Sequence, residues 1–161
     1  MIERLGKKNL LDLVEFFNKV YDKYEDMYIT INKERKFLKK NWFLIEKILK
    51  TQEVYGIFNN GLKGLLIILH EKGYRPYIKL LAESNKNYYD LMIYLRFNFM
   101  NQELFAKLKI NNPLVEILER KGFINIGMRG REVLLHKKAI REFYKITPKD
   151  NYLVDEEKRL Y

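Results

Sequence analysis

The sequence contains no cysteine, and its 161 residues include only two histidines, three prolines and eight glycines. The absence of cysteine excludes disulfide bonds, a thiol nucleophile and a cysteine-based zinc site. Because only His70 and His136 can offer an imidazole, we expect no metal site. So few prolines and glycines leave little room for flexible linkers, and a chain of this length is expected to form one domain.

The sequence also lacks a long apolar segment. No run of 18 or more apolar residues occurs, which is the length that a membrane-spanning helix needs. Residues 1–6 lead into an amphipathic stretch rather than into the apolar centre of a signal peptide. We therefore expect a cytoplasmic protein without a membrane partner, which agrees with the absence of cysteine.

Basic residues are abundant. Lysine and arginine number 31 against 21 acidic residues, which gives a formal net charge of +10. Such a balance favours anionic partners, for example nucleic acid or a phosphorylated cofactor. A lysine-rich composition with solvated surfaces explains the same excess, so both interpretations stay open. Two denser clusters are Lys33, Arg35, Lys36, Lys39 and Lys40, and then Arg129, Arg131, Lys137, Lys138 and Arg141.

The first fifty residues favour one strand and two helices. A short strand is expected at residues 2–5. Apolar residues at spacings of three and four predict a helix over 10–25, with Asn9 as its N-cap, and a second helix over 33–51, with Asn32 as its N-cap. The first basic cluster would then lie on the second helix.

The middle of the chain favours three antiparallel strands in succession. Val54 to Phe58 is β-branched and aromatic, and the following Asn60-Gly61 pair supplies the positive φ angles of a tight hairpin turn. An apolar strand is expected at 62–70, a turn at 71–76 and a third strand at 77–82. These strands form a meander.

The second half alternates helices and strands. A helix is expected at about 88–100 and a strand at 104–110. Asn112 and Pro113 open a short helix that Gly122 ends. Strands at 124–128 and 132–136 form a last hairpin around Arg129 and Gly130, followed by a helix at 139–145 and a polar end.

This order of elements resembles the GNAT (Gcn5-related N-acetyltransferase) superfamily of acyltransferases. The sharpest match is LFAKLKINNPLVEILERKGF at 104–123, in which Asn111 ends the fifth strand eleven residues before Gly122-Phe123. The resemblance implies an α+β fold with a mixed, mostly antiparallel central sheet flanked by about four helices. It assigns 1–138 to a GNAT-like domain and 139–161 to a C-terminal helix and polar tail.

The resemblance also implies an activity, the transfer of an acyl group from acetyl-CoA or another acyl-CoA to an amine. The donor would lie between the fourth and fifth strands. It would be held by backbone groups of Leu81 and Ala82, by a contact from Asn111, and by the loop residues Ser84, Asn85, Lys86 and Asn87. Two departures stand out: the loop at 83–90 contains none of the family's glycines, and Leu118 replaces the tyrosine that reprotonates the CoA thiolate in many members.

Three residues are candidates for proton transfer. Glu83 and His70, at the ends of predicted strands, are candidate general bases, and Tyr94 is a candidate acid. A different class of function is an inactive GNAT-like module that binds nucleic acid or a partner protein through basic surfaces at 33–40 and 129–141. Self-association through a sheet edge is a third possibility.

Overall fold

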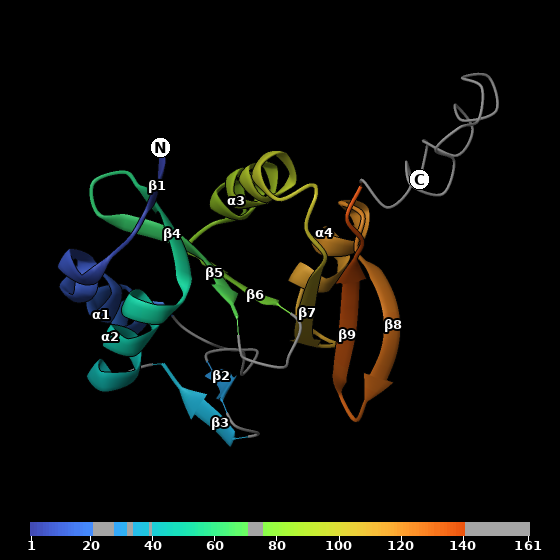
Figure 1. Ribbon diagram of the computed structural model, residues 1–161, viewed down its shortest axis with the longest axis horizontal. Helices are drawn as coiled ribbons and strands as arrows, with labels where there is room; N and C mark the ends of the chain where they lie inside the picture. The colour runs from blue at the N-terminus through green and yellow to red at the C-terminus, as the bar shows by residue number, and fades with distance from the viewer. Residues whose placement is uncertain (21–27, 32–33, 39, 71–75, 141–161) are drawn as a thin grey trace.

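The computed structural model describes residues 1–20, 28–31, 34–38, 40–70 and 76–140. The strands in these ranges are β1 (Ile2–Arg4), β2 (Tyr28–Ile31), β3 (Glu34–Phe37), β4 (Glu53–Phe58), β5 (Leu62–Leu69), β6 (Tyr77–Ala82), β7 (Leu104–Lys109), β8 (Ile124–Arg129) and β9 (Glu132–Lys137). The helices are η1 (Lys7–Asn9), a single turn, and α1 (Leu10–Lys19), α2 (Trp42–Thr51), α3 (Asn85–Asn98) and α4 (Leu114–Arg120). Figure 1 shows their arrangement.

Seven strands form one sheet, in the order β1-β4-β5-β6-β7-β9-β8, and β2 and β3 form a separate hairpin. Every neighbouring pair in the large sheet is antiparallel except β6 and β7, which are parallel. The predicted meander is confirmed as β4, β5 and β6. Its first turn uses the two positive φ angles expected from the sequence, 56° at Asn60 and 105° at Gly61.

Helices cover both faces of the large sheet. Alternate residues of a strand point to opposite faces, and the buried side chains accordingly form two clusters. In one, Leu13 and Phe17 of α1 and Ile45 of α2 pack with Leu65 and Ile67 of β5. In the other, α3 and α4 contribute Leu91, Leu95, Leu114 and Leu118, which pack with strand residues that include Leu66 and Leu80. The predicted α+β sheet with four flanking helices is confirmed.

The parallel pair β6–β7 separates almost at once. Its register contains one pair, Tyr77 with Phe105, whereas β5 and β6 pair over six residues from Gly64–Ala82 to Leu69–Tyr77. Beyond Tyr77, β6 therefore has a backbone partner on one side only. The two strands leave a wedge that opens toward their carboxyl ends, in the centre of the sheet (Figure 1).

The prediction of a helix over 33–51 is wrong in its first half. Residues 34–37 form β3, which pairs with β2, and α2 begins only at Trp42. Lys40 has a φ of 59°, which a right-handed helix does not allow, and the side chain of Asn41 caps α2 by accepting from the Leu44 N–H at 3.2 Å. Of the first basic cluster, Arg35 and Lys36 thus lie on β3 and Lys40 lies just before α2, while Lys33 and Lys39, like Asn32, lie outside the described residues.

Smaller differences concern the ends of the other helices. α1 ends at Lys19 rather than at residue 25, and residues 21–25 of the predicted helix lie outside the described residues. Asn9 occupies the predicted N-cap position, but its side chain accepts from the Gly6 N–H instead of from the helix. The predicted helix at 139–145 lies mostly outside the described residues. Its first residue, Ala139, is buried against the domain.

Candidate functional site

On the side of β6 that faces β7, backbone groups lack a partner strand after the first residue pair, although the residues that carry them are buried. The Glu83 N–H donates to the Lys63 carbonyl of β5 at 3.0 Å, and alternate residues of a strand direct their backbone groups to the same side. The N–H and C=O groups of Leu81 therefore face β5. Those of Ile78, Leu80 and Ala82 face β7, and beyond the Tyr77–Phe105 pair, which Ile78 adjoins, β7 no longer pairs with Leu80 and Ala82.

The N-terminus of α3 lies at the open end of this wedge. Only Glu83 and Ser84 separate β6 from α3, and the Ser84 hydroxyl caps the helix by accepting from the Asn87 N–H at 3.3 Å. Asn85 and Lys86 are exposed in the first helical turn, where N–H groups have no partner within the helix. The predicted loop at 83–90 is thus mostly helix, and Tyr88 packs against the core.

Glu83 stands beside this helix end as a paired carboxylate. Its oxygens lie 2.8 Å from the Lys19 ammonium and 3.5 Å from that of Lys63. The hydrogen bond from Lys19 and the charges of both lysines hold the pKa of Glu83 below its ordinary value, although partial burial opposes the shift. A carboxylate with a lowered pKa is a weaker base.

The face of the sheet that α1 and α2 cover carries a row of rings where the wedge closes. The centroids of Tyr77 and Phe105 are 5.7 Å apart, and His136 stacks on Phe105 at 4.5 Å with an interplanar angle of 17°. The Lys107 ammonium lies 4.7 Å from the Tyr77 centroid. One step along β6 from Tyr77, on the same face, is Lys79, which is only 7% exposed.

The β2–β3 hairpin crosses this part of the sheet. The Lys79 ammonium lies 5.0 Å from the centroid of Tyr28, whose hydroxyl donates to the Glu132 carboxylate of β9. Arg35 of β3 reaches the same carboxylate at 3.4 Å. Tyr28 therefore bridges β6 and β9, and with Tyr77, Lys79, Lys107 and Glu132 it makes up what we call the aromatic–lysine face.

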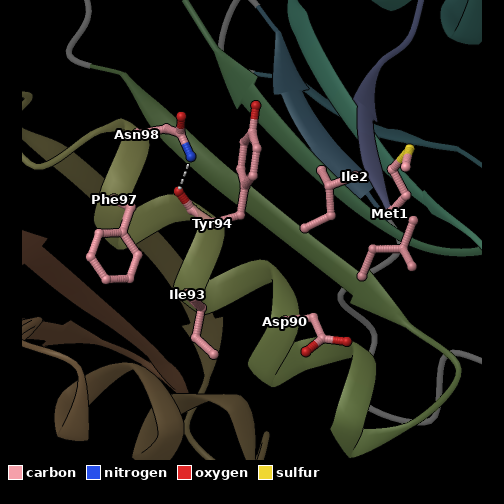
Figure 2. Close-up of a pocket in the computed structure, with 8 residues that line it drawn as sticks. Met1, Ile2, Asp90, Ile93, Tyr94, Phe97 and Asn98 are labelled. Carbon is pink, nitrogen blue, oxygen red and sulfur yellow. Dashed lines mark hydrogen bonds between the residues drawn. The ribbon is translucent and has the colours of Figure 1, made fainter.

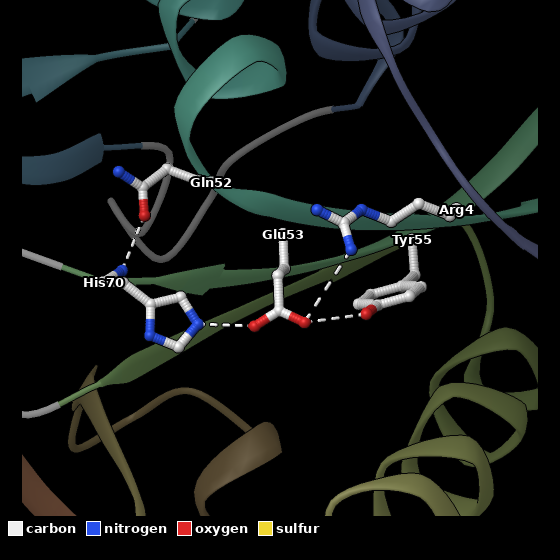
Figure 3. Close-up of polar contacts among 5 residues, drawn as sticks. All are labelled: Arg4, Gln52, Glu53, Tyr55 and His70. Atoms are coloured by element: carbon white, nitrogen blue, oxygen red, sulfur yellow. Dashed lines mark hydrogen bonds and ion pairs between the residues drawn. The ribbon is translucent and has the colours of Figure 1, made fainter.

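His70 lies at the other end of β5 from the open wedge. As Figure 3 shows, its imidazole contacts Glu53, which also accepts from Tyr55 at 2.9 Å and lies 3.9 Å from Arg4. Burial alone would raise the pKa of Glu53, but the hydrogen bonds from His70 and Tyr55 hold it below its ordinary value. Burial, reinforced by Glu53, raises the pKa of Tyr55 to about 12. The polar groups of His70, Glu53 and Tyr55 are thus paired with one another.

Tyr94 lines an open groove of about 440 Å³ between α3 and the β1 edge, with Met1, Ile2 and Phe97 among its neighbours (Figure 2). Its ring packs 5.3 Å from that of Tyr55. The three predicted catalytic residues are thus not brought together: Glu83 is at the open end of the wedge, His70 at the opposite end of β5, and Tyr94 on α3.

The two remaining motif residues lie on either side of the start of α4. Asn111 is exposed in the turn after β7, while Asn112 accepts from the Leu114 N–H at 2.9 Å and so opens α4 as expected. Leu118 is 1% exposed in the core, where it packs and offers no proton.

The described residues contain no group of three acidic or histidine side chains that could hold a metal ion, and no helix among them is long and apolar enough to cross a membrane.

Comparison with solved structures identifies the fold. The chain is similar to an N-acetyltransferase from Staphylococcus aureus Mu50, at 19% identity over 87% of this chain and 97% of the other, with a TM-score of 0.56. A GNAT-family acetyltransferase from Bacillus cereus matches at 12% identity, over 86% and 96%, with a TM-score of 0.62. A chimeric spermidine N-acetyltransferase from Vibrio cholerae matches at 14%, over 88% and 98%, with a TM-score of 0.60.

The chain therefore has the GNAT fold. No protein-family model and no curated protein sequence matches it. The predicted resemblance is confirmed at the level of the fold, and at these identities the likeness does not extend to an activity.

Sequence reasoning missed the aromatic–lysine face. Tyr28 and Glu132 are 104 residues apart, and no local pattern links them. One signal was present in the sequence, since Lys79 interrupts the otherwise apolar stretch of β6 after Tyr77. A lysine at the centre of a buried strand is rare and indicates a specific environment.

Proposed function

We propose that the protein transfers an acyl group from an acyl-CoA, such as acetyl-CoA, to an amine. The observation that carries this proposal is the parallel β6–β7 pair that separates after one residue pair, with the N-terminus of α3 at its open end. Unpaired backbone groups of a strand can bind amide groups of a ligand, and an exposed helix N-terminus can bind its phosphates. Together they suit a ligand with amide groups along its length and phosphates at one end.

The donor would be held as follows. The amide groups of its pantetheine arm would pair with the backbone of Leu80 and Ala82, so of the two strand residues predicted from the sequence, Leu81 and Ala82, we favour Ala82. Its pyrophosphate would accept from the N–H groups of Asn85 and Lys86 and would lie near the Lys86 ammonium. Ser84 and Asn87 would flank it, and Asn111 would face it from the end of β7. Ile78 lies about 13 Å along the strand from Ala82, so the acyl group would reach the closed end of the wedge.

We assign the proton transfers to Tyr28 and Glu132. The amine nitrogen forms a bond to the acyl carbon while the carbon–sulfur bond breaks, so one proton must leave the nitrogen and one must reach the sulfur. Glu132 would take the first proton, and Tyr28, hydrogen-bonded to Glu132, would supply the second. This pair would do the work of the tyrosine that Leu118 replaces. Glu83 acting through water stays the alternative base.

Calorimetric titration with acetyl-CoA tests the donor site. We expect micromolar binding to the wild-type protein and about tenfold weaker binding to Lys86→Glu, because that substitution places a negative charge at the helix end. Lys47→Glu is the matched control, since Lys47 is an exposed helical lysine on α2. Absence of binding at millimolar acetyl-CoA would overturn the proposal.

A second candidate is a basic module that binds nucleic acid. It is favoured by the contact of Arg35 with Glu132, which brings one residue of the first basic cluster to the hairpin end that carries Arg129 and Arg131. Lys137, however, donates inward to the carbonyls of Phe99 and Gln102. Titration of a short DNA duplex at 50 and 200 mM salt decides the matter: strongly salt-dependent binding without acetyl-CoA binding would favour this candidate.

A further inference from the structure

We infer that the acceptor is a small amine that also carries an anionic group, a carboxylate or a phosphate, and that Lys107 and Lys79 recognise this group. The inference rests on the proposed acyl transfer and names its acceptor class. Its basis is the charge of the aromatic–lysine face, on the side of the wedge opposite α3 and α4.

The two lysines lie on neighbouring strands and on one face. Lys79 follows Tyr77 by two residues on β6, and Lys107 follows Phe105 by two residues on β7, while Tyr77 and Phe105 are register partners. The 4.7 Å contact between the Lys107 ammonium and the Tyr77 ring shows that these side chains share a face. Both ammonium groups therefore lie beside the closed end of the wedge, where the acyl group would stand.

The rings fix the positions of these cations. An ammonium over the face of a tyrosine is held by the ring quadrupole, and more strongly where water is excluded. Lys79 lies over Tyr28 at 5.0 Å and is buried, while Lys107 lies over Tyr77 and is exposed. No carboxylate among the described residues pairs with Lys107, so its charge is available to a ligand.

The acidic side chains around this face are already engaged. Glu132 accepts from Tyr28 and contacts Arg35, Glu103 contacts His136 at 2.9 Å, and Glu83 holds Lys19 and Lys63. A polycationic acceptor needs acidic groups that are free to receive it, and here it would meet two ammonium groups instead. An amine with its own negative group would find a cation for that group.

A matched pair of small amines tests the inference without acyl-CoA. Phosphoethanolamine and ethanolamine carry the same amine and differ by one phosphate, β-alanine replaces the phosphate with a carboxylate, and spermidine is a polycation. Calorimetric titration is expected to show binding of phosphoethanolamine or β-alanine at least tenfold tighter than that of ethanolamine and spermidine. Equal or tighter binding of spermidine would overturn the inference.

Two lysine variants locate the anion site. Lys107→Met is expected to weaken binding of the preferred anionic amine about tenfold while leaving acetyl-CoA affinity within twofold, and Lys47→Met should change neither. Lys79→Met is measured only after its melting temperature shows that it folds. Because Lys107 is exposed, K107M decides the question by itself, and unchanged affinity in K107M would overturn the assignment.

The outcomes for the two proposals are distinct. Anionic amine binding that depends on Lys107, together with acyl transfer from acetyl-CoA, supports both. The same binding without any thiol release from acetyl-CoA keeps the anion site and overturns acyl transfer. Binding of a DNA duplex that depends on Lys107, without binding of the small amines, overturns the small-acceptor inference.

Discussion

The hydroxyl of Tyr28 donates a hydrogen bond to the carboxylate of Glu132, and this contact joins the β2–β3 hairpin to β9 across the face of β7. Arg35 approaches the same carboxylate and also lies 4.6 Å from the Tyr28 centroid. This acidic side chain thus helps to hold a hairpin that is not part of the large sheet and that also packs into the core through Ile29. The contact also sets a tyrosine hydroxyl and a carboxylate on the face of the sheet that α1 and α2 cover, with Glu132 in register with Lys109 near the carboxyl end of β7.

Tyr28→Phe and Glu132→Gln test the assigned proton transfers. We expect each to lower the rate of acyl transfer by about 10²-fold or more, because each removes one proton carrier from the pair. Acetyl-CoA affinity should stay within twofold, since neither side chain is assigned to the donor. Steady-state rates measured with calorimetric binding check this, and full activity in both variants would refute the assignment.

Glu83→Gln tests whether the Glu83 carboxylate has a structural or a catalytic role. Its lowered pKa means that the ion pairs with Lys19 and Lys63 stabilise the protein above the unfolded-state pKa and cease to do so as pH falls through the folded-state value. We expect E83Q to lower the melting temperature by about 1–2 °C at pH 7 and by less at pH 3. Activity should fall by less than fivefold, and a 10²-fold loss would instead establish Glu83 as the base.

Asn41→Ala tests the corrected start of α2. The Asn41 side chain accepts from the Leu44 N–H, so its removal leaves a donor of the first turn without a partner. We expect a loss of about 1 kcal/mol in the free energy of unfolding, measured by urea denaturation. Asn101→Ala, at an exposed turn after α3, should change it by less than about 0.5 kcal/mol. Equal effects of the two would count against the cap.

Leu118→Ala tests whether this position packs or reacts. Leu118 of α4 is fully enclosed by the core, so truncation is expected to cost about 2–5 kcal/mol of unfolding free energy. Leu11→Ala, at a side chain that is 58% exposed, is the control and should cost far less. A variant that folds should keep its acetyl-CoA affinity, because Leu118 faces the core and not the wedge.

Much of the fold followed from local patterns. The Asn60-Gly61 turn, the apolar runs of β4, β5 and β6, and the opening of α4 at Asn112 each depend on residues close together in the sequence. Conformational preferences of this kind act over a few residues, so the sequence predicted them well. The order of these elements was sufficient to indicate the GNAT fold.

The errors occurred where local preference was weak. The apolar residues Leu38, Trp42, Ile45 and Leu49 have the spacing of a helix, but Asn41 caps α2 and the residues before Leu38 pair with β2 as β3. Likewise, α3 begins at Asn85 because Ser84 can cap it there, which turns an expected loop into the first turn of a helix. In both places a side-chain cap, rather than apolar periodicity, decided the boundary.

The sequence by itself determined the seven strands of the large sheet and their order along the chain, the positive charge and the absence of cysteine chemistry. Only the tertiary structure decided which side chains meet at the wedge. It separated Glu83, His70 and Tyr94, and it brought Tyr28 to Lys79 and Glu132. The physical reason is that these contacts depend on sheet register and on the docking of a distant hairpin, which arise from packing across the whole domain and leave no pattern in neighbouring residues.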